Sequence, residues 1–189
     1  MKQEAPSDKG VLVGMPEFVL RDKDGNIKKL WNENKIGKFI RTFFGFDLKG
    51  VFFLGEWKNS LALKNLITSA GKAGLASRIN GVGSEAAFTY LAVGTGATAA
   101  NVADTTLQTE ITDSGLARAA ATCTRVTTSV ANDTAQLDKT FSVTGTKAVT
   151  EVGAFNASSA GVLLGRQVFS AINVVNGDSL QIIYKFQAS

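Results

Sequence analysis

Histidine is absent from the 189 residues of this chain, and cysteine occurs once, as Cys123. Without histidine the sequence lacks the usual general base, the commonest metal ligand and the usual activator of a serine or cysteine nucleophile. One cysteine cannot form an intramolecular disulfide, and a zinc site needs several cysteine or histidine ligands. We therefore expect no catalytic residue, no metal site and no cofactor, and we expect Cys123 to be a buried, inert thiol.

Long apolar segments are also missing. No apolar run approaches the roughly 20 residues of a membrane-spanning helix, and the polar first ten residues do not resemble the apolar core of a signal peptide. The net charge is only +4, and the basic residues form no long run of the kind found in nucleic-acid-binding arms. These absences predict a soluble protein of a reducing cytoplasm, with neither a membrane nor a nucleic acid as its partner.

The composition changes near residue 58. Residues 1–58 hold 11 Lys/Arg and 8 Asp/Glu, both prolines, both tryptophans and seven of the twelve phenylalanines. Residues 59–189 are dominated by Ala, Thr, Ser, Gly and Val, a composition that favours strands packed through small and β-branched side chains. We predict an N-terminal arm over 1–58 and a main β domain over 59–189.

The arm contains two patterns. Glu17–Arg21 and Asn26–Trp31 flank the dipeptide Asp24-Gly25, which predicts a β-hairpin. The stretch 37–46 then alternates basic with large apolar residues. Its aromatic side chains must be covered by the domain or by a partner, because burying each one contributes roughly 1.5–3 kcal/mol. We predict a docking arm whose partner-binding residues are the large aromatic ones: Trp31, Phe39, Phe43, Phe44 and Trp57.

Three alternatives for this stretch stay open. The aromatic residues can complete the local core of the domain. They can form a stacking platform for single-stranded nucleic acid, with Lys35, Lys38 and Arg41 at the phosphates. They can also lie on a membrane surface as a short amphipathic element. Glu33 and Asp47 dilute the positive field that the last two alternatives require.

The main domain begins with a predicted helix over 60–79, capped by Asn59 or Ser60 and stopped at Asn80-Gly81. After it we predict short strands separated by polar turns: 88–93, 116–130, 136–144, 149–155, 162–169 and a last strand that places Leu180, Ile182, Tyr184 and Phe186 on one face. Consecutive strands without intervening helices predict a mainly β fold, an antiparallel β-sandwich or jelly-roll-like domain with one helix.

Three motifs suggest chemistry but fit it poorly. Gly94–Ala99 matches the dinucleotide pattern G-x-G-x-x-A, yet no helix is predicted after it. Asp22–Asn26 has its glycine at position 4, whereas a calcium loop needs it at position 6. The acids Asp133 with Asp138, or Glu110 with Asp113, can be cast as glycosidase pairs, but closeness in sequence on turns does not make a cleft. We interpret all three as turns.

Five short motifs in a fixed order carry a resemblance: Lys64-Asn-Leu-Ile-Thr68, Phe88-Thr-Tyr-Leu-Ala-Val-Gly-Thr-Gly96, Asp104-Thr-Thr-Leu-Gln-Thr-Glu110, Val149-Thr-Glu-Val-Gly-Ala-Phe-Asn156 and Asn176-Gly-Asp-Ser-Leu180. Over about residues 59–189 the chain resembles a family of structural proteins of the tailed-bacteriophage virion. The resemblance implies a β-sandwich without catalytic residues that assembles, often in many copies, on the particle.

From this resemblance we expect a capsid decoration or cement protein whose partners are the major capsid protein and further copies of itself. Its expected location is the virion, at the capsid surface. A neck or tail component, such as an adaptor or a fibre base, is the alternative within the same class. A host-glycan-binding or hydrolytic module is the alternative from another class, although most of the aromatic residues precede the predicted sandwich.

Overall fold

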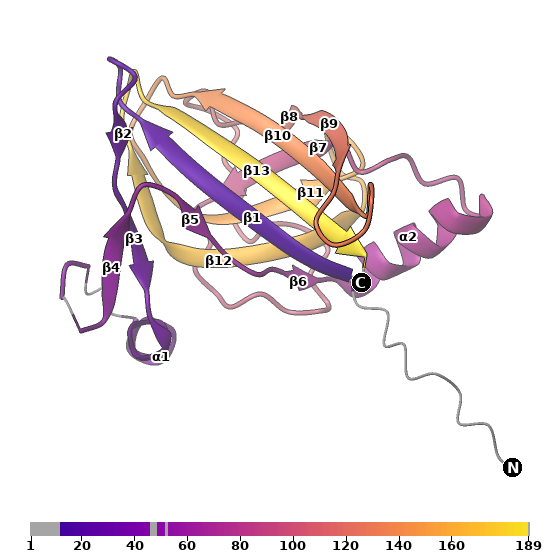
Figure 1. Ribbon diagram of the computed structural model, residues 1–189, viewed down its shortest axis with the longest axis horizontal. Helices are drawn as coiled ribbons and strands as arrows, with labels where there is room; N and C mark the ends of the chain where they lie inside the picture. Colours follow the sequence, from indigo (N-terminus) through magenta and orange to yellow (C-terminus); the bar gives the residue numbers. More distant parts are fainter. Residues whose placement is uncertain (1–11, 46–48, 52, 189) are drawn as a thin grey trace, which may run out of the picture.

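The structure is a computed structural model that describes residues 12–45, 49–51 and 53–188. It is mainly β, with two large antiparallel sheets packed against each other and a small third sheet at one side (Figure 1). The predicted antiparallel β-sandwich is therefore confirmed. The described residues form two helices, however, rather than the single one that we predicted.

The first sheet has the order β2-β1-β13-β10-β9, and β5 also pairs with β1. Its strands are β1 (Leu12–Arg21), β2 (Ile27–Lys28), β5 (Leu61–Ala62), β9 (Thr122–Val126), β10 (Thr134–Ser142) and β13 (Ser179–Ala188). The predicted alternation along β13 is confirmed, because Leu180, Ile182, Tyr184 and Phe186 are all buried. One face of this sheet thus supplies half of the core.

The second sheet has the order β6-β12-β11-β7-β8. Its strands are β6 (Leu66–Ile67), β7 (Tyr90–Gly94), β8 (Ala119–Ala120), β11 (Lys147–Phe155) and β12 (Leu163–Val174). The predicted hairpin of β11 and β12 is confirmed by their antiparallel register. The predicted strand 116–130 is instead divided, because β8 and β9 belong to different sheets and the chain crosses between them at Ala121.

The core lies between the sheets. Phe18 of β1 and Phe169 of β12 contact each other across it, with ring centroids 4.6 Å apart. Tyr184 is fully buried and receives a hydrogen bond of 2.5 Å from the Asn65 side chain, while burial raises the pKa of its hydroxyl. Burying that hydroxyl with a partner avoids the free-energy cost of an unpaired polar group.

The predicted helix over 60–79 is shorter in the structure. Helix α2 (Ser69–Asn80) begins nine residues after the predicted start at residue 60. The residues before it are in strands instead, because β5 (Leu61–Ala62) pairs with β1 and β6 (Leu66–Ile67) pairs with β12. Thr68 is its N-cap, and its hydroxyl accepts a hydrogen bond from the Gly71 amide. Gly71 is buried against β12, where a Cβ atom would lie 2.2 Å from the Leu164 carbonyl oxygen. The glycines thus permit close packing on the sheet.

The compositional boundary at residue 58 does not divide the structure. Strand β1 pairs with β13 along its whole length, so residues 12–21 are part of the sandwich. The predicted hairpin is present, since Leu20 pairs with Lys28 and Gly25 occupies the turn with a φ of 83°. The part that stands apart from the sandwich begins only after β2.

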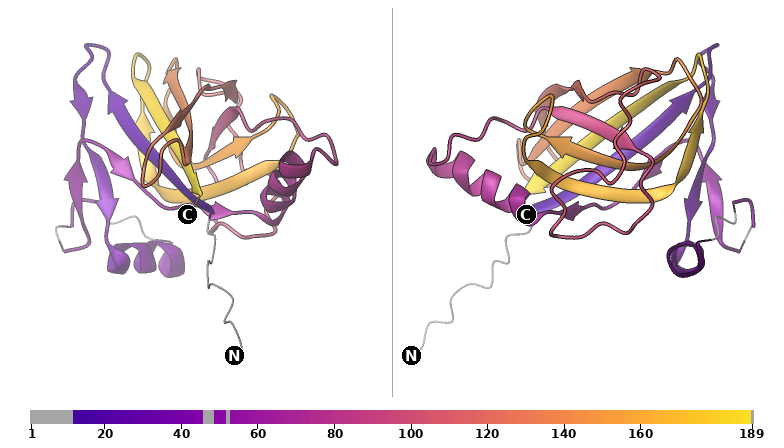
Figure 2. Two further views of the ribbon diagram at one scale, coloured as in Figure 1. Left: turned by 45° about the vertical axis from the view of Figure 1, so that its right-hand side comes forward. Right: turned by 180° about the vertical axis from the view of Figure 1, so that it is seen from behind.

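We call this part, residues 29–58, the α1 module. It consists of β3 (Leu30–Glu33), helix α1 (Lys35–Phe44) and β4 (Gly55–Lys58), and β3 and β4 form the small third sheet. The module lies at the end of the molecule opposite α2 (Figures 1 and 2). A helix at this position was missed by our sequence analysis, which described the stretch as an arm.

Candidate attachment surface

Helix α1 has well-formed ends. Asn34 is the N-cap, and its side-chain oxygen accepts hydrogen bonds of 3.0 Å from the amides of Ile36 and Gly37. Its side-chain nitrogen donates to the Phe53 carbonyl across the module. Gly45 ends the helix in the left-handed conformation and donates to the Arg41 carbonyl. These caps matter because a ten-residue helix is marginal on its own.

The side of α1 that faces the domain is polar. Arg41 donates to both carboxylate oxygens of Glu33, with a closest distance of 2.6 Å, and Ser170 of β12 donates to the same carboxylate. Gly37 allows the helix to approach the module's own backbone, because a Cβ atom there would lie 2.6 Å from the Leu54 carbonyl oxygen. An ion pair and a glycine contact, rather than an apolar core, therefore hold α1 in place.

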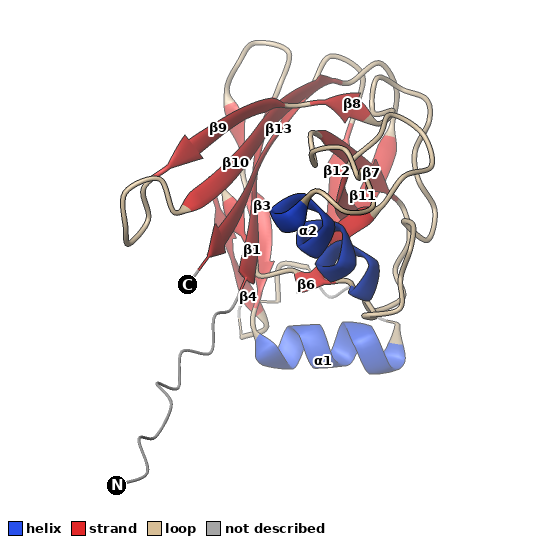
Figure 3. Ribbon diagram, turned by 90° about the vertical axis from the view of Figure 1, so that its right-hand side faces the viewer, coloured by secondary structure: helices blue, strands red, loops and turns tan. Residues whose placement is uncertain are grey.

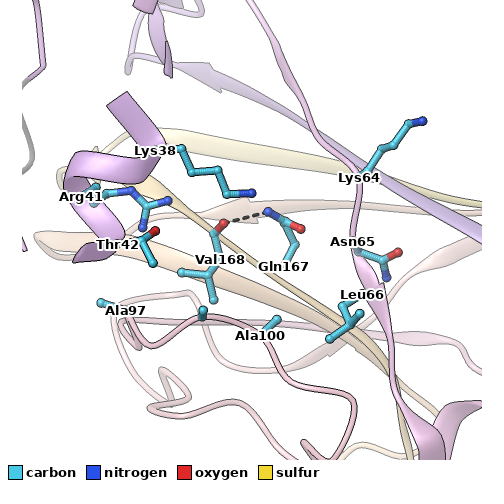
Figure 4. Close-up of a pocket in the computed structure, with 11 residues that line it drawn as sticks. Lys38, Arg41, Thr42, Lys64, Asn65, Leu66, Ala97, Ala100, Gln167 and Val168 are labelled. Atoms are coloured by element: carbon cyan, nitrogen blue, oxygen red, sulfur yellow. Dashed lines mark hydrogen bonds between the residues drawn. The ribbon is translucent and has the colours of Figure 1, made fainter. Parts of the chain in front are cut away.

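A solvent-accessible pocket of about 250 Å³ separates α1 from the sandwich. Helix α1 contributes Lys38, Arg41 and Thr42 to its wall, and β12 contributes Gln167 and Val168. Figure 4 shows the Lys38 side chain extending from the helix toward Gln167. Lys38 and Arg41 thus lie on the side of α1 that faces the domain.

The opposite side of α1 is apolar and points to solvent. The spacing of Ile36, Phe39 and Phe43 places them on one face of the helix. In Figure 3, α1 lies beneath the sandwich, and no described helix or strand covers its far side. We call the module's exposed large apolar side chains the aromatic ridge, and every one of them is at least half exposed: Ile36, Phe39, Phe43, Phe44, Phe53 and Trp57.

The structure separates the five residues that we predicted to bind a partner. Phe39, Phe43, Phe44 and Trp57 all lie in the aromatic ridge, and Phe43 is the most exposed of them at 74%. Phe39 and Phe43 stack on each other with centroids 4.8 Å apart. Trp31 differs, because it is only 6% exposed and its ring lies edge to face with that of Trp57. Trp31 therefore supports the ridge from beneath.

The loop at Gly94–Ala99 binds a carboxylate of this chain rather than leaving its amides free. Glu151 is fully buried and accepts hydrogen bonds from the amides of Gly96, Gln108 and Thr109. It also accepts a 2.8 Å hydrogen bond from Arg166, whose other end pairs with Asp104 at 2.9 Å. This buried network fixes the loop 94–110 against β11 and β12.

The two carboxylate pairs that we considered for hydrolysis are occupied by structural contacts. Glu110 pairs with Arg118, and Asp113 pairs with Lys147. Asp138 accepts from Gln181. Asp133 accepts hydrogen bonds from backbone amides of the turn before β10, which lower the pKa of its carboxyl well below the usual range. All four acids thus stabilise turns or sheet faces.

The remaining candidate positions are simple. The Asp22 carboxylate accepts hydrogen bonds from the backbone amides of Asp24 and Asn26, as expected for the turn of a hairpin. Our prediction of a buried Cys123 is wrong, because Cys123 lies exposed on β9 at the edge of the sheet. Partial burial raises the pKa of its thiol. In the described ranges no three metal-ligating side chains come together, and no helix is long and apolar enough to cross a membrane.

Comparisons with known proteins return no relative. No family model, no curated protein and no solved structure matches the chain. The aromatic ridge must therefore be interpreted from its own geometry.

Proposed function

We propose that this protein is a non-enzymatic structural component of a tailed-phage virion, and specifically a capsid decoration or cement protein. The short motifs between Lys64 and Leu180, in their order along the chain, support the assignment to a virion. The β-sandwich fold agrees with it. A cement protein needs contact area rather than chemistry, since a specific interface buries about 1,200–2,000 Å² in total.

The aromatic ridge is the observation that carries the proposal. Soluble monomers rarely expose contiguous apolar patches larger than a few hundred Å², and larger ones mark interaction sites. Every strongly exposed aromatic side chain in the described part of the chain belongs to the α1 module. Aromatic residues dominate binding free energy when a partner desolvates them. The module is therefore the surface through which the protein attaches to the particle.

The contacts of the acidic residues support a role without catalysis. The carboxylates that might have served as acid and base hold turns, and Glu151 is sealed beneath the 94–110 loop with four donors. Carboxylate oxygens that already accept this many hydrogen bonds are held in place by the fold and are not free to contact a substrate. In this proposal the acidic side chains stabilise the fold, and the function of the protein is assembly rather than catalysis.

A reconstruction of the particle, together with a count of copies per particle, tests this function. Hundreds of copies on the head, with the α1 module against the major capsid protein, are expected. About a dozen copies or fewer at the neck or tail would replace the cement function by that of an adaptor or fibre base. Absence of the protein from purified particles, or glycan binding by the purified chain, would refute a structural role in the virion.

A further inference from the structure

The positive charge of the molecule is concentrated where the aromatic ridge lies. The α1 module contains six Lys/Arg and three Asp/Glu, which gives it a net charge of +3 out of +4 for the whole chain. The remaining 159 residues are therefore close to neutral, with 14 basic and 13 acidic residues. The first turn of α1 holds no acid. A partner that complements this surface is acidic as well as apolar.

The acids of the module are already neutralised where the structure describes them. Glu33 pairs with Arg41, and Glu56 pairs with Lys58 at 2.9 Å. Lys35 and Lys38 are both exposed on α1, but only Lys35 lies at the flank of the ridge, one turn before Phe39, while Lys38 lines the pocket between the helix and the sandwich. The module thus presents an apolar strip with a basic side chain at its flank, on a segment whose net charge is positive.

A second copy of the chain fits the ridge poorly. Two ridges facing each other would bring two modules of charge +3 together, which is unfavourable at ordinary ionic strength. Helix α1 is also only about 15 Å long. A face-to-face pair of such short helices would fall below the roughly 1,200 Å² of a stable interface. The ridge is therefore directed at a different molecule.

A lipid surface fits less well than a protein. A helix lying on a bilayer directs its basic side chains to the headgroups at its flanks. Here Arg41 is bound to Glu33, and Lys38 lines the pocket behind the helix (Figure 4). The walls of a protein groove enclose a helix from the sides, where they can reach Lys35.

We propose that the aromatic ridge inserts into an apolar groove rimmed by acidic side chains on a neighbouring virion protein. This inference rests on the proposed function, since it takes the neighbour to be part of the particle. Phe43 is the central anchor, because it is the most exposed aromatic of the ridge and stacks on Phe39. Lys35, at the flank of the ridge, meets the acidic rim.

The test is re-binding of the purified full chain to particles of the encoding phage that lack this protein. Phe43→Ser is expected to weaken binding at least about tenfold. The double variant Lys35→Glu, Lys38→Glu is expected to weaken it on the order of fivefold, and binding of the unchanged chain should fall as salt is raised. Lys35→Glu also favours the helix, because it places an acid in the first turn.

Two variants on α2 serve as matched controls. Ile79→Ser removes an apolar side chain that is 88% exposed, and Lys72→Glu reverses an exposed charge at the opposite end of the molecule. Both should bind particles within about twofold of the unchanged chain, as surface changes outside an interface do. Circular dichroism of every variant confirms that each one is folded.

The other possible outcomes separate failure of this inference from failure of the proposed function. If the unchanged chain binds and the ridge and charge variants bind equally well, the inference is overturned while the proposed function stands. Dimerisation of the free chain that Phe43→Ser abolishes, seen by sedimentation equilibrium, would assign the ridge to a second copy. If the unchanged chain does not bind the particles but binds phosphatidylcholine vesicles that contain phosphatidylglycerol, and the Phe43→Ser variant does not bind these vesicles, both the inference and the virion function are overturned.

Discussion

The sandwich and the α1 module distribute their side chains in opposite ways. Strand β13 buries one apolar face and leaves its other, mainly polar face partly exposed, whereas α1 turns its polar side inward and its apolar side to solvent. Each region also contains a glutamate–arginine pair, Glu151–Arg166 in the sandwich and Glu33–Arg41 in the module. The first pair is almost completely buried, and the second is partly open to water.

The difference shows which forces hold each region. The sandwich is stabilised by apolar burial, and the Glu151 carboxylate of its buried ion pair accepts further hydrogen bonds from three backbone amides, which help to offset the cost of burying the charge. Helix α1 relies on a cap, a glycine contact and a partly accessible ion pair, and the exposed apolar side chains of the aromatic ridge contribute little to folding. Those side chains stay available for binding free energy.

The largest expected effect is in the buried pair. Glu151→Gln keeps the side-chain volume but leaves Arg166 without its buried counter-charge, so the free energy of unfolding should fall by about 3–5 kcal/mol. Urea denaturation measures this loss. The control is Glu56→Gln in the exposed pair with Lys58, which should leave the stability nearly unchanged, since exposed ion pairs contribute little. Equal effects of the two changes would remove the contrast between buried and open pairs.

The next largest effect is expected where α2 packs on the sandwich. Gly71→Ala places a methyl group against the Leu164 carbonyl and should push α2 away from β12, at a cost of about 1–3 kcal/mol. Alanine is the better helix former by about 1 kcal/mol, so a purely local effect would have the opposite sign. Thermal unfolding measures the change. A rise in melting temperature would show that α2 can move without loss.

A smaller and more local effect is expected at the base of the module. Arg41→Ala leaves the Glu33 carboxylate without its counter-charge but with the Ser170 hydroxyl as a donor, and it should destabilise α1 by about 1–3 kcal/mol. Hydrogen exchange should accelerate for amides of 35–44 while those of β13 stay protected. If exchange accelerates throughout the molecule, the module and the sandwich unfold together.

The smallest effect on folding should come from the ridge itself. Phe43→Ser removes a large aromatic side chain, yet the free energy of unfolding should change by no more than about 0.5 kcal/mol, because Phe43 is mostly exposed. The matched change in the core, Phe18→Ala, should cost about 3–5 kcal/mol. Urea denaturation of both variants tests this. A substantial loss of stability from Phe43→Ser would place the ridge within the folding core.

The sequence predicted the strands better than it predicted the module, and the reason is physical. Alternation along β10 and β13 follows from burial of one sheet face, so it is visible in the residues themselves. In α1 the repeat of Ile36, Phe39 and Phe43 signals a helix, as do Asn34 before it and Gly45 after it. The mixture of basic and aromatic residues concealed that repeat.

Other features depend on tertiary structure that no local pattern contains. The apolar face of α1 could be predicted from its periodicity, but nothing in that periodicity says that this face points away from the domain. Cys123 lies among small residues that suggest burial, yet its strand is at a sheet edge. Glu151 lies beside a β-bulge and is buried, and only its distant partners Gly96 and Arg166 explain it.

The pairing of β3 with β4 has a consequence for how this protein can vary. Leu30 lies opposite Lys58, so the chain leaves the sandwich and returns to it at neighbouring points. The segment between them therefore has adjacent ends, and its length and sequence can change without altering the path of β1 or β5. A segment of different length and sequence can therefore be joined to the same sandwich, so the surface that this protein exposes here can change without a change in the fold.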